Sequence, residues 1–98
     1  MFMEQFPVAH LNVQNVNVII IFLSQKFDRM TPADQHAVHR QLQTTATSAG
    51  LVGNVVPIWQ DAFAHTKFIA PPQQHPFFRS TSYDALYAHV NRTLTING

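Results

Sequence analysis

Aromatic, amide and imidazole side chains crowd the segment between residues 59 and 79. Small pockets and protein interfaces are built from such groups. Three prolines stiffen the loop 71–79, so ordering this loop on binding would cost less conformational entropy. We therefore expect a ligand or interface site here, with these residues: Trp59, Asp61, His65, Gln73, Gln74, His75, Phe77, Phe78 and Arg79.

A structural interpretation competes with this one, because Phe77 and Phe78 could fill the core where the loop crosses the end of a sheet. Both interpretations hold if one ring is buried and the other is presented. The aromatic residues could also stack on single-stranded nucleic acid beside Lys67, Arg79 and Arg92. Three basic residues supply little positive charge for binding a phosphate backbone, so we predict no nucleic-acid partner.

Asp61 and His65 bracket an expected hairpin loop and could meet across it. An aspartate can orient an imidazole for acid–base work, and Thr66 or Ser80 could then supply a nucleophilic hydroxyl. However, the sequence contains no Gly-x-Ser-x-Gly nucleophile elbow. A hydrogen bond that stabilises the turn is the favoured interpretation, and the sequence assigns no catalytic residue.

His36 and His39 are three residues apart on an expected helix, a spacing that can hold a transition metal. Both lie off the apolar stripe of that helix, and the spacing of the sequence places no third ligand. The chain also lacks cysteine. We therefore expect a solvated helix face and predict neither a metal site nor a cofactor.

Low charge is the unusual feature of the composition, since only 11% of residues are Asp, Glu, Lys or Arg where about 25% is typical. The start of the chain has no basic residue, so it does not resemble a signal peptide. The apolar run 18–23 is far shorter than the ~20 residues of a membrane helix. Together with the absence of cysteine, these features favour a cytoplasmic protein with no membrane partner.

Residues 16–23 are apolar on both alternating faces, which predicts a central buried strand. Residues 8–13 also alternate and could form a short extra strand, whereas 1–10 are expected to be a partly disordered leader. A helix is predicted over 32–49, with Thr31 as N-cap and Gly50 as its left-handed C-terminal residue.

Two further strands are expected at 55–60 and 66–70. Pro57 cannot donate to a ladder, so the first of them should lie at a sheet edge. Residues 71–76 should be irregular because of their prolines. A last helix should begin near 80–82, with Thr81 as its cap and an apolar stripe of Tyr83, Leu86, Tyr87, Val90 and Leu94.

These elements predict one α+β domain over residues 1–98, a two-layer sandwich in the order β-α-β-β-α. The first strand would pair with the third, and the tail 95–98 would fray or add a short strand. The arrangement is similar to half of a ferredoxin-like fold without a clear final strand. This is an analogy of fold and carries no function.

If both helices covered one face of the sheet, the other face would leave several hundred Å² of apolar surface in water. Low charge would not oppose association of two such faces. The leading functional hypothesis is therefore a small homo-oligomeric interaction or regulatory module, most simply a two-fold dimer, with an unknown protein partner also open. The alternative is a small-molecule-binding protein or small enzyme with a pocket between the sheet and the 71–79 loop.

Overall fold

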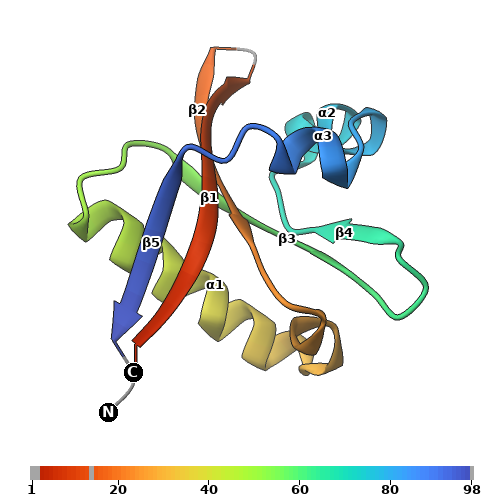
Figure 1. The fold of residues 1–98 in the computed structure, drawn as a ribbon, viewed down its shortest axis with the longest axis horizontal. Helices are drawn as coiled ribbons and strands as arrows, with labels where there is room; N and C mark the ends of the chain where they lie inside the picture. The colour runs from red at the N-terminus through yellow and green to blue at the C-terminus, as the bar shows by residue number, and fades with distance from the viewer. Residues whose placement is uncertain (1–2, 14, 98) are drawn as a thin grey trace.

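A five-stranded mixed sheet forms the middle layer of the molecule, with strand order β4-β3-β2-β1-β5 (Figure 1). The computed structural model describes residues 3–13 and 15–97. Neighbouring strands are antiparallel except β2 and β3, which run parallel on either side of a helical crossover. The strands are β1 (Met3–Val13), β2 (Val16–Phe22), β3 (Asn54–Gln60), β4 (Thr66–Phe68) and β5 (Arg92–Asn97).

The crossover helix α1 spans Pro32–Ser48, as predicted. The Thr31 hydroxyl accepts a hydrogen bond from the Asp34 amide at 3.1 Å, and Gly50 ends the helix with φ of 86°. Leu51 N then donates to Ala46 O at 3.0 Å, which closes the turn that a left-handed glycine permits. The shorter helical elements are η1 (Gln25–Arg29), η2 (Pro72–Gln74), α2 (His75–Ser80) and α3 (Tyr83–Tyr87).

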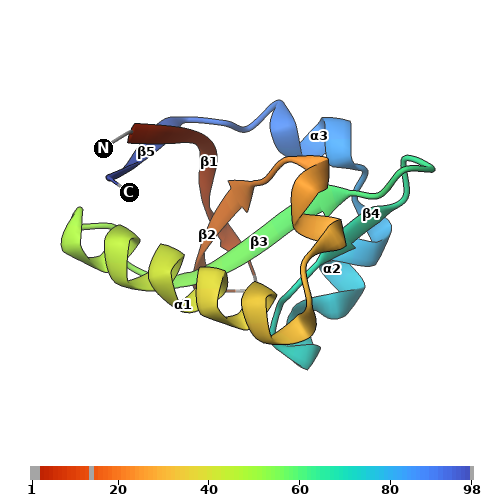
Figure 2. The ribbon, with the colours of Figure 1, turned by 90° about the horizontal axis from the view of Figure 1, so that it is seen from below.

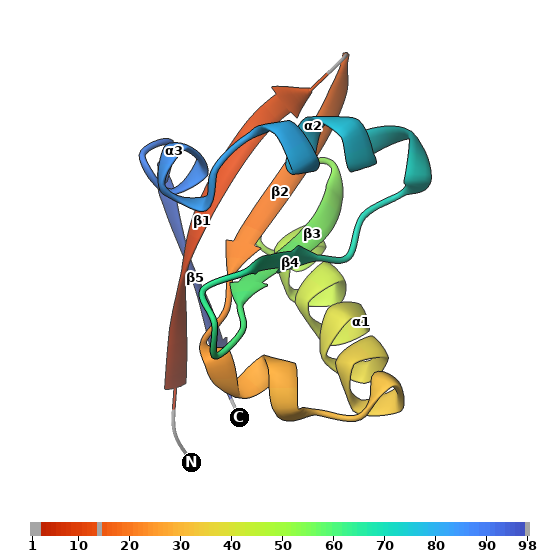
Figure 3. The ribbon, with the colours of Figure 1, turned by 90° about the vertical axis from the view of Figure 1, so that its right-hand side faces the viewer.

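Helices cover both faces of the sheet, with α1 on one side and α2 and α3 on the other (Figures 2 and 3). Ile19 and Ile21 of β2 pack toward α1, with Leu42. The alternating residues, among them Ile20, pack toward α2 and α3 with Phe78. The α+β class is confirmed. The expected β-α-β-β-α order is found from β2 to α2, but β1 precedes it and α3 and β5 follow it, and the molecule has three layers rather than the two expected.

This arrangement removes the bare apolar face on which the expected dimer rested. The apolar residues of β3 are buried within the single chain, because each face of the strand has its own helical cover. The exposed side chains opposite α1 at the β1–β5 end of the sheet are polar: Gln5, Thr93 and Thr95. Self-association therefore needs another surface.

Both ends of the chain are more ordered than the sequence predicts. Residues 3–10 belong to β1 rather than to a disordered leader, and Val8 and Ala9 are fully buried; residues 1 and 2 lie outside the described ranges. The tail, which was expected to fray or to add a short strand, forms β5 from Arg92 to Asn97 and pairs with β1. The expected pairing of the predicted strand 16–23 with the predicted strand 66–70 is wrong. The first of these is β2, which lies between β1 and β3, and the second is β4, which pairs with β3.

Pro57 lies inside the sheet and not at its edge, which corrects the prediction. Its carbonyl accepts a hydrogen bond from Ile69 N at 3.1 Å, on the β4 side of β3. Because the amide and carbonyl of one strand residue point to the same side, the missing Pro57 N–H also faces that side. β4 ends at Phe68, before the position opposite Pro57. No strand residue there depends on a hydrogen bond from the Pro57 nitrogen.

The segment 71–76 is helical in part and not irregular, because its prolines occupy first turns. Pro72 begins η2 and Pro76 lies in the first turn of α2, where a helix needs no amide donor. The last helix is short and is capped by Ser82, not Thr81; the Ser82 hydroxyl accepts from Ala85 N at 3.1 Å. Leu94, expected on its stripe, belongs to β5 and packs on the α1 side.

Side chains replace missing strands at two places along the sheet. The Val55 amide donates to Gln43 Oε1 (2.8 Å) and the Val55 carbonyl accepts from His39 Nε2 (2.8 Å), both from α1. At the other end, the Asn91 amide bonds both backbone groups of His10, at 3.0 and 3.1 Å. Buried or half-buried backbone groups thus find partners where no strand reaches them.

Candidate functional site

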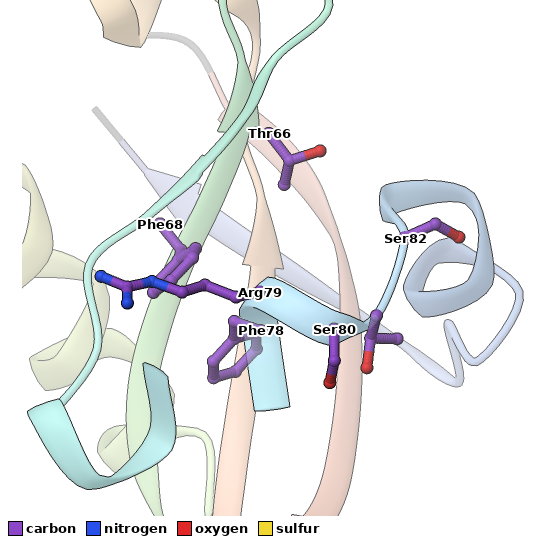
Figure 4. Close-up of a pocket in the computed structure, with 7 residues that line it drawn as sticks. Thr66, Phe68, Phe78, Arg79, Ser80 and Ser82 are labelled. Carbon is purple, nitrogen blue, oxygen red and sulfur yellow. The ribbon is translucent and has the colours of Figure 1, made fainter. Parts of the chain in front are cut away.

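An open groove of about 480 Å³ lies between β4 and the segment that links α2 to α3 (Figure 4). Its volume is within the range of roughly 300–1,000 Å³ that small-molecule sites occupy. The groove has two phenyl rings, one guanidinium and four hydroxyl side chains. The lining residues are Thr66, Phe68, Phe78, Arg79, Ser80, Thr81 and Ser82.

Aromatic contacts fix the position of the groove's two walls. The Phe68 ring of β4 lies 5.2 Å from the Phe78 ring of α2, and Phe78 is 2% exposed. The His75 ring meets Phe68 edge-on at 5.3 Å and donates from Nε2 to Ala70 O at 2.8 Å. His75 therefore ties the start of α2 to the chain that leaves β4, and it positions the groove rather than lining it.

Arg79 carries the charge of the groove. Its side chain extends from α2 alongside the Phe68 ring (Figure 4) and is exposed. Among the residues that the structure describes, no carboxylate lies within ion-pair distance of it. The guanidinium is thus free to bind an acceptor from solution.

Two of the four hydroxyls already serve the backbone. Ser80 Oγ donates to Phe77 O at 3.1 Å, and Ser82 Oγ accepts from Ala85 N. The Thr66 and Thr81 side chains have no hydrogen bond within the described residues. These two hydroxyls are uncommitted, while Ser80 can still accept and Ser82 can still donate a hydrogen bond to a ligand.

Asp61 stabilises the turn between β3 and β4, as the favoured interpretation predicts. Its Oδ1 accepts from the amides of Phe63 and His65, each at 2.9 Å, and its Oδ2 lies 3.3 Å from His65 Nδ1. The amide of His65, more than that of Phe63, lowers the pKa of Asp61 against the opposing effect of burial. His65 is largely exposed, and no hydroxyl in the described part of the chain hydrogen-bonds its ring.

Trp59 belongs to a separate polar cluster on the α1 side of the sheet. Its indole Nε1 donates to Asp28 Oδ1 at 3.1 Å, and Lys67 Nζ lies 3.0 Å from the same oxygen. The hydrogen bond from Trp59, followed by that from Lys67, lowers the pKa of Asp28. Asp28 was not anticipated, because nothing in the sequence links η1 to β4.

The structure therefore divides the predicted site. Phe78 and Arg79 line the groove, His75 supports it, and Phe77 contacts Phe78 at 5.1 Å. Gln73 is exposed, while Gln74 is 3% exposed and its Oε1 has no partner among the described residues. Trp59, Asp61 and His65 lie outside the groove lining.

Five lining residues were missed as ligand contacts: Phe68, assigned to the core, and Thr66, Ser80, Thr81 and Ser82, assigned as possible nucleophiles or to the start of the last helix. The run Ser80–Ser82 is typical of a helix start, and this pattern gave no sign that the same residues line the groove. In the histidine pair on α1, His39 Nε2 donates to the Val55 carbonyl, while His36 is exposed. Within residues 3–13 and 15–97, no three His, Cys, Asp or Glu side chains come together as metal ligands.

No helix in the described ranges is long and apolar enough to cross a membrane. Comparison of the chain with family models, with curated proteins and with solved structures finds no significant match.

Proposed function

We propose that this chain is a small-ligand-binding module whose groove at β4 and α2 takes an amphipathic carboxylate. The observation that carries the proposal is the pairing of an unpartnered guanidinium with an aromatic wall. Arg79 extends beside Phe68 in an open groove of about 480 Å³. The ligand class follows from these two features.

Arg79 favours a carboxylate over a more highly charged anion. A guanidinium presents parallel N–H donors that match the two oxygens of a carboxylate. The groove lining contains no second basic residue that would help to neutralise a dianion. The free hydroxyls of Thr66 and Thr81 can bond a neutral polar group of the ligand, such as an amide.

Phe68 and Phe78 favour an apolar or aromatic group next to the carboxylate. Their rings are tilted by 34° to each other, and Phe68 borders the open groove. Ring pairs in offset or edge-on arrangements contribute about 0.5–1.5 kcal/mol beyond simple burial. The stiff entry into α2 through Pro72 and Pro76 limits the entropy lost when a ligand binds.

N-acetylphenylalanine combines a carboxylate, a ring and an amide, and it is the probe that tests this proposal. A titration followed by ¹H–¹⁵N correlation spectra should show saturable shifts at the groove residues, with a Kd on the order of 1 mM. The matched probe is N-acetylphenylalanine amide, which lacks the charge. It should bind at least about tenfold more weakly, because a hydrogen bond to a charged group contributes roughly 1.5–3 kcal/mol.

Arg79→Gln should weaken binding of N-acetylphenylalanine by a similar factor of about ten. The control is Arg40→Gln, since Arg40 is an exposed arginine on α1, on the opposite side of the sheet. Equal binding of the acid and the amide, or unchanged binding by Arg79→Gln, would show that the guanidinium does not recognise the ligand. Shifts spread over the whole surface would also reject the groove.

The homo-oligomeric interaction module remains a second candidate function. The low charge of the chain still favours it, with 11% charged residues and a net charge of +1. A specific surface that supports it is the outer edge of β5.

A further inference from the structure

The two edges of the sheet are built differently. β4, at one edge, has three residues, includes Lys67 and is followed by Pro71 and Pro72. Short length, lysine and proline are devices that keep an edge strand from pairing with another chain. β5, at the other edge, has six residues with no lysine and no proline.

Hydrogen bonds to β1 show which backbone groups of β5 point outward. The His10 backbone faces the β5 side, because both of its groups bond the Asn91 side chain. Val8 faces the same way, since its carbonyl accepts from Asn91 N at 3.0 Å. Strand residues alternate in direction, so Phe6 also faces β5, whereas Pro7, which has no N–H to give, does not.

The partner residues on β5 follow from the register. Phe6 pairs with Leu94 and Val8 with Arg92, so these β5 residues direct their backbone groups to β1. The intervening residues Thr93, Thr95 and Asn97 direct theirs away from the sheet. Within residues 3–13 and 15–97, no side chain or backbone group bonds those outward groups.

Elsewhere, the molecule covers such open positions with its own side chains. Gln43 and His39 bond the backbone of Val55, and His75 bonds the Ala70 carbonyl beyond β4. Only Thr66 and Phe68 leave backbone groups facing outward from β4, and both line the groove. The outer edge of β5 is the longer open ladder and has no such cover.

We propose that the outer edge of β5 binds β5 of a second copy, antiparallel and about a two-fold axis, so that the two sheets become one. The occupant is a second copy because the edge is self-complementary. With the axis at Thr95, Thr95 of each copy faces Thr95 of the other, and Thr93 faces Asn97. Arg92 then lies far from its symmetry mate, so the one charge on the strand is not opposed by a like charge.

This register can be tested with opposite charges at a single exposed position. Thr95→Lys and Thr95→Glu each place like charges opposite one another at the axis, which should weaken the dimer by up to about fivefold. An equimolar mixture of the two variants places lysine opposite glutamate and should restore association. Thr95→Val keeps the backbone and the β propensity, and it is the matched control.

The measurement is light scattering coupled to size exclusion, across about a hundredfold range of micromolar concentrations. The expected mass is twice 11.1 kDa, about 22 kDa, for the wild type, for Thr95→Val and for the charge mixture. Each charged variant alone should shift toward 11.1 kDa with an unchanged circular dichroism spectrum. A wild type that stays at 11.1 kDa throughout would overturn the proposal, as would a dimer indifferent to both charged variants.

Discussion

Phe78→Ala should be among the most damaging single changes in this chain. Phe78 is 2% exposed in α2 and joins the core opposite α1, in the 71–79 segment that the sequence predicts to be a loop. Truncation of a buried phenylalanine costs about 3–5 kcal/mol, through lost transfer energy and the cavity left behind. A domain of this size is stable by about 5–15 kcal/mol, so the change removes a large share of that stability.

Urea unfolding measures this effect, and Trp59 is a built-in probe because it is the sole tryptophan and is buried. At about 4–8 °C per kcal/mol, the melting temperature should fall by roughly 12–40 °C. Phe78→Leu keeps most of the volume and should cost only about 1–2 kcal/mol, which keeps the comparison measurable if the alanine variant does not fold. Phe63→Ala is the matched control, since Phe63 is 81% exposed and its loss should stay within about 0.5 kcal/mol.

A loss below about 0.5 kcal/mol for Phe78→Ala would show that α2 does not pack on the sheet. The three-layer arrangement would then be wrong, and the groove would lose one of its walls. A loss as large for Phe63→Ala would mean that the β3–β4 turn is covered and not exposed.

Three further predictions concern backbone and charge. Gly50→Ala should cost about 1–2 kcal/mol in urea unfolding, because its φ is left-handed but the space around it is open; Gly53→Ala should cost clearly more, because the new Cβ would collide with the Asn17 carbonyl. Gln43→Ala should cost about 1–3 kcal/mol in the same assay by leaving the Val55 amide without its acceptor, and a loss near zero would mean that water replaces it. Asp28 and Asp61 have pKa values lowered by folding, so their contribution to the free energy of unfolding is complete above the unfolded-state pKa near 4 and is lost as the pH falls below that value. Below about pH 4, the urea midpoint of the wild type should therefore drop more than that of a variant with both residues changed to Asn.

The helix α1 and the strand β2 could be predicted because their signals are local. The cap at Thr31, the glycine at 50 and the two-sided apolar run around Ile20 each act over a few residues. The position of β3 could not be predicted in the same way. Whether a proline suits an interior strand depends on where the neighbouring strand stops, and that is a tertiary fact.

The candidate site was predicted in part for the same reason. Phe78 and Arg79 were singled out by their chemistry, and both line the groove. Trp59 is near them in sequence, but it faces the other side of the sheet, because strand side chains alternate. The hydroxyls of Thr66 and Thr81 line one groove because the contact between Phe68 and Phe78 brings β4 and the end of α2 together, and the sequence does not reveal that contact.

The most direct test of the groove as a binding site is a set of intermolecular nuclear Overhauser contacts with N-acetylphenylalanine. The ring protons of the probe should contact Phe68 and Phe78, and the side-chain N–H signals of Arg79 should shift with the acid but not with the amide. Contacts confined to the exposed Phe63, or no contacts at concentrations above about 1 mM, would contradict the assignment of the groove.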